Sequence, residues 1–415
     1  MRKPWMIFVV LALAASACGD DTAVDAGSTT SAGAAVSGAA RLPADPSAPT
    51  GAWVDGVNAA GWRLHLTLPE GNAVSSPLSI GTAFSFARGG ASDDAGAVLD
   101  TIFGFPAGAD AHAAANAAAS DLATADTGTT TLEVANRLFP NLGFTPAQDF
   151  VDLGVAYYGS GVQPVDTSDG AAAAGEINGW VNDRTRGLIP EIVSADVVQD
   201  KEMFLVNTVY LFAEWDTPFL AELTFDGEFT TGEGATVTAP FMTSHEPEPR
   251  RFVSLADADA VELPYADGDL AMWLIVPHDD DGVESLEASL AAADLTGLPG
   301  RATEGLVQLT MPKWEQELPP HDLFAWLCPE GLCPGAGFDG IAADLFISDA
   351  LHGARIVVDE AGTEAAAVTA LGFADSAGPE ADLTVTADHP FLWAIVHEPT
   401  GSLVFLGRVT DPTVP

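Results

Sequence analysis

This sequence is organised around one stretch, Val357-Val358-Asp359-Glu360-Ala361-Gly362-Thr363-Glu364-Ala365-Ala366-Ala367-Val368-Thr369-Ala370. Its first residues are typical of a strand, and residues 359–362 are typical of a turn in which glycine is free to take a positive φ. The residues that follow are small or β-branched and include no proline, so alternate positions can share one face of a strand. We therefore expect a strand and a turn, followed by a segment small enough to enter between two existing strands.

The N-terminus has the pattern of a secretory signal. Two basic residues precede an apolar run, residues 6–15, which is too short to span a bilayer. Ala15-Ser16-Ala17 fits a signal-peptidase site, and Cys18 follows it directly, as in bacterial lipoproteins. We predict a signal peptide over residues 1–18 and a secreted or extracytoplasmic protein. Lipidation of Cys18, which would anchor the protein in the cell envelope, is favoured over simple cleavage.

The rest of the chain is predicted to form a linker and one large domain. Residues 19–50 are rich in Ala, Gly, Ser, Thr, Asp and Pro and have little to bury, which is typical of a flexible linker. Neither a second linker nor an internal repeat interrupts residues 51–415. The net charge of −44 disfavours nucleic acid and anionic lipid as partners. We expect a monomer that reaches a membrane only through an N-terminal lipid.

Motifs for enzymes, cofactors and metals are missing from the sequence. It contains no nucleophile elbow, zinc-protease motif, phosphate loop or dinucleotide fingerprint. Cys328 and Cys333 flank a turn-like Pro-Glu-Gly-Leu segment, and outside the cytoplasm a local disulfide is the simple expectation. A metal site would need two further soft ligands nearby. We therefore predict that the protein is not an enzyme and holds neither a metal nor a cofactor.

Polar residues stand at two places where the surrounding pattern predicts burial. Ser76 precedes Pro77 and is placed to cap the helix that follows. Residues 203–212 form a strand too apolar for one wet face, and Asn207 inside it needs a hydrogen-bond partner.

From about residue 55 to the C-terminus, the sequence resembles the serpin family. The family's motifs are matched by the hinge-like stretch quoted above and by five further segments: Leu132–Phe139, Ile177–Ile189, Val261–Tyr265, Val307–Trp314 and Ala387–Val409. The resemblance suggests a bacterial secreted or lipoprotein member. It implies an α+β fold with a large, mostly antiparallel central sheet, smaller sheets, eight or nine helices and an exposed reactive-centre loop.

The resemblance also assigns roles to five residues of the central sheet and its surroundings. It places Ser76 and Ser79 beneath the point where strands part to admit the loop. It implies a hydrogen bond between Asn207 and His352 on a neighbouring strand, and it places Trp215 at the top of the sheet, where insertion begins.

The reactive-centre loop follows from the same resemblance. Its hinge would comprise Glu360, Gly362, Thr363, Glu364, Ala365, Ala366 and Ala367. The family's spacing of sixteen positions after Glu360 makes Ser376-Ala377 the reactive bond. The loop is slightly longer than in familiar members, so Phe373 and Ala374 remain rivals.

The function implied by the resemblance is inhibition of serine endopeptidases, with cysteine endopeptidases as a second target class. The protease cleaves the loop and is held as an acyl-enzyme while the freed segment inserts into the sheet. Small residues at the bond suit an elastase-like or subtilisin-like target, and Phe373 suits a chymotrypsin-like one. Because no Arg or Lys lies between Arg355 and Arg408, a trypsin-like target is disfavoured. The alternative is a non-inhibitory serpin that acts as a binding or surface protein.

Overall fold

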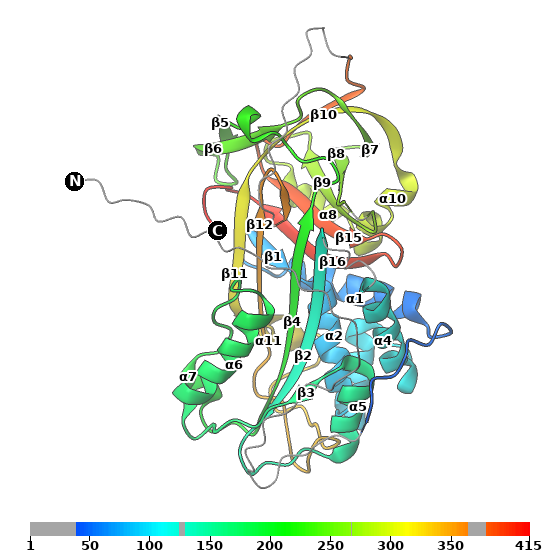
Figure 1. Ribbon diagram of the computed structural model, residues 1–415, viewed down its shortest axis with the longest axis vertical. Coiled ribbons are helices and arrows are strands. Elements are labelled where there is room, and N and C mark those ends of the chain that lie inside the picture. Colours follow the sequence, from blue (N-terminus) through cyan, green and yellow to red (C-terminus); the bar gives the residue numbers. More distant parts are fainter. Residues whose placement is uncertain (1–38, 124–128, 267, 364–378) are drawn as a thin grey trace, which may run out of the picture. The chain divides into compact units, whose positions relative to one another are not determined.

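The computed structural model describes residues 39–123, 129–266, 268–363 and 379–415 (Figure 1). Within these ranges the secondary structure is mixed, and no helix is long and apolar enough to cross a membrane. The helices are α1 (Thr50–His65), α2 (Pro77–Arg88), α3 (Asp93–Phe103), α4 (Ala109–Ala123), α5 (Gln148–Tyr158), α6 (Gly170–Arg184), α7 (Ala195–Val198), α8 (Val283–Ser289), α9 (Ala292–Thr296), α10 (Leu298–Arg301) and α11 (Phe324–Leu327), with the 3₁₀ helix η1 (Ala221–Leu223).

The described residues thus contain eleven α-helices, more than the eight or nine expected from the sequence. Five of them, α7 to α11, span seven residues or fewer. Helices this short have too few turns to show a 3.6-residue pattern of apolar residues, so the sequence does not reveal them. The expected α+β fold with mostly antiparallel sheets is confirmed.

One sheet has six strands and contains the beginning of the predicted hinge. Its order is β11 (Trp314–Asp322), β12 (Leu351–Val358), β13 (Gly362–Thr363), β4 (Met203–Glu214), β2 (Thr130–Pro140) and β3 (Gly161–Val162). The long strands β2 and β4 pair antiparallel along their whole length, and so do β11 and β12 apart from one irregularity. In the part of the chain that the structure describes, only the two residues of β13 join these two halves of the sheet.

The second sheet has ten strands and carries much of the core. Nine of them lie in the order β1 (Ala73–Ser75), β16 (Ser402–Val409), β15 (Phe391–His397), β9 (Leu270–Pro277), β8 (Ala258–Pro264), β7 (Glu248–Ser254), β10 (Thr303–Pro312), β6 (Thr236–Thr243) and β5 (Phe225–Thr230), and β14 (Leu383–Thr386) pairs parallel with β10. Alternate residues of β15 belong to two different apolar clusters, Trp393 and Ile395 to one and Leu392 and Ala394 to the other. Because successive side chains of a strand point to opposite faces, this sheet is covered on both sides.

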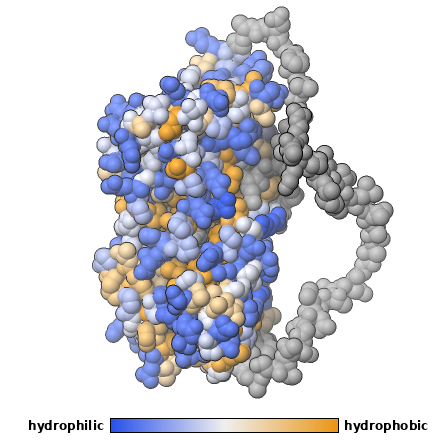
Figure 2. Space-filling model, turned by 90° about the vertical axis from the view of Figure 1, so that its left-hand side faces the viewer, coloured by the Kyte–Doolittle hydropathy of each residue, from blue (hydrophilic) through white to orange (hydrophobic). Residues whose placement is uncertain are grey.

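The surface reflects the acidic composition. Figure 2 shows one face on which hydrophilic residues are widespread and hydrophobic residues occur in small groups among them. Most cations of the described residues are paired with carboxylates, as in the ion pairs of Arg88 with Asp100 and of Arg184 with Glu133.

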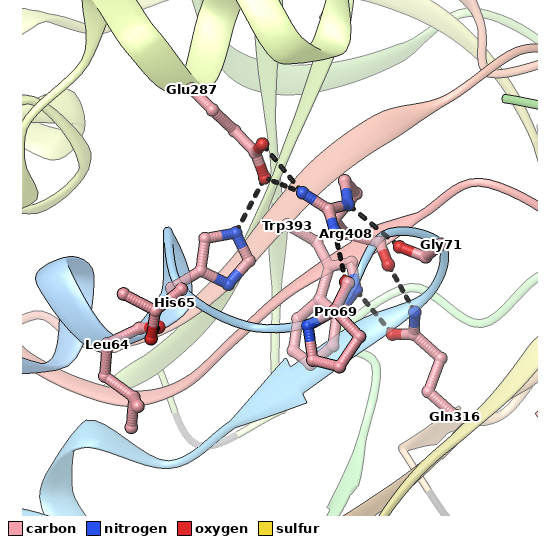
Figure 3. Close-up of polar contacts among 9 residues, drawn as sticks. Leu64, His65, Pro69, Gly71, Glu287, Gln316, Trp393 and Arg408 are labelled. Carbon is pink, nitrogen blue, oxygen red and sulfur yellow. Dashed lines mark hydrogen bonds and ion pairs between the residues drawn. The ribbon is translucent and has the colours of Figure 1, made fainter. Parts of the chain in front are cut away.

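The two sheets are connected by a buried polar network (Figure 3). Gln316 of β11 donates its amide N–H to the backbone oxygen of Arg408 and accepts a hydrogen bond of 2.9 Å from the indole N–H of Trp393. The Arg408 guanidinium contacts both carboxylate oxygens of Glu287, at 2.8 and 2.7 Å, and Glu287 also lies 2.8 Å from Nε2 of His65. Helices α1 and α8 and strands β11, β15 and β16 therefore meet at a hydrogen-bonded centre.

Replacing Gln316 tests how much this network contributes to stability. Gln316 is 1% exposed, and Leu at this position would leave the buried Trp393 N–H without its acceptor and would remove the hydrogen bond to the Arg408 carbonyl. We expect the free energy of unfolding to fall by about 2–4 kcal/mol in Gln316→Leu, measured by urea denaturation. The exposed Gln148→Leu variant is the control, and a similar small change in both variants would contradict this role.

Candidate functional site

The predicted hinge begins with a turn that is fixed by two aromatic residues. Trp215 is 3% exposed and stacks on Tyr265, with ring centroids 4.6 Å apart and an interplanar angle of 11°. Its indole N–H donates to the carbonyl oxygen of Asp359 at 3.0 Å, and its backbone N–H donates to that of Ala361 at 2.9 Å. Trp215 therefore holds the backbone of the turn, while its role in insertion stays a prediction.

Glu360, in the same turn, is held by a cation and a hydroxyl. Its carboxylate accepts hydrogen bonds from Nζ of Lys313 and from the hydroxyl of Thr224, both at 2.7 Å. Burial by itself would raise the pKa of Glu360, but these two groups outweigh that effect and hold the pKa below its usual value. The Glu360 side chain is therefore charged at neutral pH and ties the turn to the beginning of β11.

The next two residues lie inside the six-stranded sheet. Thr363 pairs with Val358 of β12 on one side and with Ala213 of β4 on the other. Its side chain is 2% exposed, and its hydroxyl lies 2.6 Å from the hydroxyl of Tyr265. Gly362 has a φ of 152°, and a Cβ at this position would collide with the carbonyl oxygen of Ala213, so only glycine fits here.

The remaining residues of the predicted loop lie outside the described residues. They are Glu364, Ala365, Ala366 and Ala367 of the hinge and the candidates for the reactive bond, Phe373, Ala374, Ser376 and Ala377. Their assignments stay predictions.

Beyond β13, strands β4 and β12 are separate. Among the described residues β4 pairs with β2 and β13, and β12 pairs with β11 and β13, but β4 and β12 do not pair with each other. A pocket of about 220 Å³ occupies this region and is lined by residues of β4, β12 and α2 and by the segment that precedes β12. We call it the central pocket. Thr363 thus lies at one end of a gap between two strands that both pair antiparallel with it.

Polar residues of the central pocket link both strands to the beginning of α2. The Ser76 side chain caps this helix by accepting the Ser79 N–H at 3.1 Å, as the sequence predicts. The backbone N–H of Ser76 donates to Nε2 of His352 on β12 at 3.2 Å, and the hydroxyl of Ser79 donates to the Asn207 side chain on β4. One helix terminus therefore contacts both edges of the gap.

The direct hydrogen bond expected between Asn207 and His352 does not form in this structure. Asn207 instead donates to the side-chain oxygen of Asn136 at 2.9 Å and accepts from Ser79, while His352 accepts from Ser76. The reason is the separation of β4 from β12, which places the two side chains on opposite edges of the gap.

Three residues of the site have no role assigned from the sequence. Asn136 lies in a serpin-like motif directly opposite Asn207 in the register of β2 and β4, Tyr265 bonds Thr363, and Lys313 pairs with Glu360. A polar residue within each of two neighbouring apolar strands is a signal that could have suggested the Asn136–Asn207 pair. For Tyr265 and Lys313 the sequence offers only their membership of serpin-like motifs.

Of the cysteines, Cys328 and Cys333 form a disulfide at the end of α11. Cys18 lies outside the described residues, and its lipidation stays a prediction.

No group of three or more His, Cys, Asp or Glu residues suited to a metal ion occurs in the described ranges.

Burial makes His352 sensitive to acid. Burial, with a smaller effect of His321, lowers the pKa of His352 to about 4, and burial also lowers that of His112 to about 4. Between pH 6.5 and 4 the unfolded chain binds protons at these histidines that the folded chain does not. Stability is therefore lost as the pH falls through this window, and each histidine should account for about 2 kcal/mol at pH 5.

We predict that His352→Gln reduces the loss of unfolding free energy between pH 7 and pH 5 by about 2 kcal/mol. Glutamine retains an acceptor for the Ser76 N–H but does not titrate. Urea denaturation at the two pH values measures the difference, with the exposed His245→Gln as the control. An unchanged loss in His352→Gln would show that folding does not lower the pKa of His352.

Comparisons with known proteins agree with this geometry. A family model described as serpin (serine protease inhibitor) matches residues 62–412. Leukocyte elastase inhibitor A of Mus musculus is 32% identical over 375 residues, which cover 84% of this chain and 95% of the mouse protein. Tengpin, a thermophilic serpin solved in its native state, has a TM-score of 0.79 at 23% identity and covers 90% of this chain and 97% of its own. Human thyroxine-binding globulin has a TM-score of 0.78 at 25% identity, with coverage of 88% and 99%.

Proposed function

This chain belongs to the serpin family, and on that basis we propose that it inhibits a serine endopeptidase by conformational trapping. One observation carries the proposal. Thr363 is already paired between β12 and β4, and beyond it the described residues show no pairing between these two strands, with the central pocket lying between them. A strand that continues from Thr363 would enter this gap.

The chemistry of such a trap needs only one bond to be cleaved. The serine hydroxyl of the protease attacks a loop carbonyl, the peptide bond breaks, and the new amino terminus leaves with the proton. The N-terminal part of the loop stays joined to the protease as an ester. If this part then inserts between β4 and β12, the attached protease is carried away from its docking position before water hydrolyses the ester.

Insertion would lower the free energy of the protein, because the inserted strand would pair with both β4 and β12. It would be antiparallel to both β4 and β12, as Gly362 and Thr363 already are. Each added ladder hydrogen bond contributes about 0.5–1.5 kcal/mol, and apolar side chains would fill the central pocket. Small residues at Ala365, Ala366 and Ala367 favour entry because they pass between packed strands with little steric resistance.

The relatives and the loop sequence support an elastase-like target. The mouse relative is named as an inhibitor of leukocyte elastase, and the candidates Ser376 and Ala377 are small enough for a shallow primary pocket. Subtilisin-like enzymes have a similar requirement, and Phe373 would suit a chymotrypsin-like enzyme. Cysteine endopeptidases are a further class to be tested. The N-terminal signal pattern of residues 1–18 supports export, with an anchor at Cys18.

A non-inhibitory carrier is the second candidate, because human thyroxine-binding globulin shares the fold at a TM-score of 0.78. The alanine-rich hinge favours the inhibitor, since a carrier does not need a loop that can enter the sheet. The two functions differ in whether a covalent complex with a protease forms.

Incubation with elastase-like, subtilisin-like and chymotrypsin-like enzymes tests the proposed function. We expect at least one of them to form a complex that survives denaturation, and mass spectrometry of the released peptide identifies the cleaved bond within residues 371–379. Cleavage of this loop by all of the enzymes without any covalent complex would favour the carrier.

Replacing Thr363 tests the insertion step. Arginine at this buried position would place a charge inside the sheet where Thr363 already pairs with β12 and β4, which costs several kcal/mol. The residues that follow should then pair more slowly, so that the ester is hydrolysed before insertion is complete. We expect the moles of Thr363→Arg consumed per mole of protease inhibited to rise by about tenfold or more. Thr363→Ser retains the hydroxyl that bonds Tyr265 and should stay within about twofold of the parent protein. Equal inhibition by both variants would argue against insertion.

A further inference from the structure

The central pocket has the size and lining of a small-molecule site. Its volume of about 220 Å³ exceeds that of an engineered cavity of about 150 Å³ which binds benzene. Apolar side chains from several elements line it, among them Ile80 and Phe84 of α2, Leu205 of β4, and Phe338 and Ile341 of the segment before β12. An apolar molecule that entered would be surrounded by side chains from elements far apart in the sequence.

His352, which lines this pocket, has one hydrogen-bond donor without a partner. Its Nε2 accepts the backbone N–H of Ser76, so the ring proton of the neutral imidazole lies on Nδ1. Within the described ranges, no hydrogen bond or ion pair involves Nδ1, although the residue is only 6% exposed. Burial lowers the pKa of His352 to about 4, so the imidazole is neutral at pH 7 and offers this single N–H.

The charged and amide side chains that line the pocket are already paired. Ser79 bonds Asn207, and two residues before β4 the Lys201 ammonium lies 2.6 Å from a carboxylate oxygen of Asp349. An ionic ligand would find no free opposite charge among these residues. A neutral ligand with one acceptor would satisfy the Nδ1–H of His352, which has no partner among the described residues.

We propose that the central pocket binds a small, neutral, largely apolar molecule with one carbonyl oxygen, which accepts the Nδ1–H of His352. Such a molecule would lie between β4 and β12, where the proposed function places the inserting strand. The consequence for inhibition therefore depends on the proposed function, whereas binding itself does not.

Acetophenone and ethylbenzene form a matched pair of probes, because they have similar size and only acetophenone has a carbonyl acceptor. We expect isothermal titration at pH 7 to show acetophenone binding with a dissociation constant on the order of millimolar or tighter. Ethylbenzene should bind about tenfold more weakly, since it leaves the His352 N–H without an acceptor. Equal affinities would overturn the role of His352, and no binding of either probe would overturn the site.

A pocket-filling variant tests the location. Ala83 lines the pocket from α2, so Ala83→Phe should abolish binding of both probes, while Ala97→Leu on the exposed face of α3 should leave binding unchanged. Binding that survives in a folded Ala83→Phe protein, as judged by circular dichroism, would place the ligand elsewhere. The comparison of the two probes needs no variant, so a folding failure of Ala83→Phe leaves the proposal testable.

A separate measurement addresses regulation. If the protein traps a protease, saturating acetophenone should raise the amount of inhibitor consumed per protease by at least twofold, because the gap is occupied. Unchanged consumption at full occupancy would show that the ligand does not regulate insertion. A failure to inhibit any protease would contradict the proposed function and leave the titration result intact.

Discussion

The structure depends on the pairing of two residues, Gly362 and Thr363, between β12 and β4. Trp215 holds the turn before them, Tyr265 holds the Thr363 hydroxyl, and Lys313 neutralises Glu360. In the described residues, β13 alone joins the two halves of the six-stranded sheet. Beyond β13, strands β4 and β12 are separate, and the proposed inhibition depends on this separation. Each of these contacts positions the start of the gap.

Polar residues of the central pocket hold the edges of β4 and β12 in place on both sides of the gap. The first turn of α2 reaches both edges, through Ser76 to His352 and through Ser79 to Asn207. In the part of the chain that the structure describes, the two edges are thus linked through a helix and not to each other. A strand that enters beside Asn207 and His352 does not have to break a direct hydrogen bond between these two described residues. The central pocket offers room for its side chains.

Local signals in the sequence predict local features well. The Ser76 cap follows from one serine before a proline, and the serpin-like motifs predict the fold. The separation of β4 from β12 is not predictable in this way, because it depends on pairing between residues more than a hundred positions apart. The resemblance to serpins implies a direct Asn207–His352 bond, whereas the structure pairs Asn207 with Asn136 and Ser79. The reactive bond lies outside the described residues and stays a prediction.

The central claim is that the intact protein holds less stabilising pairing than its sheet is able to form. Thermal unfolding before and after a single protease cut within residues 371–379 measures this most directly. We predict that the cut protein melts at a temperature higher by tens of degrees, because the freed segment pairs with both β4 and β12. Equal melting temperatures for intact and cut protein would contradict the account.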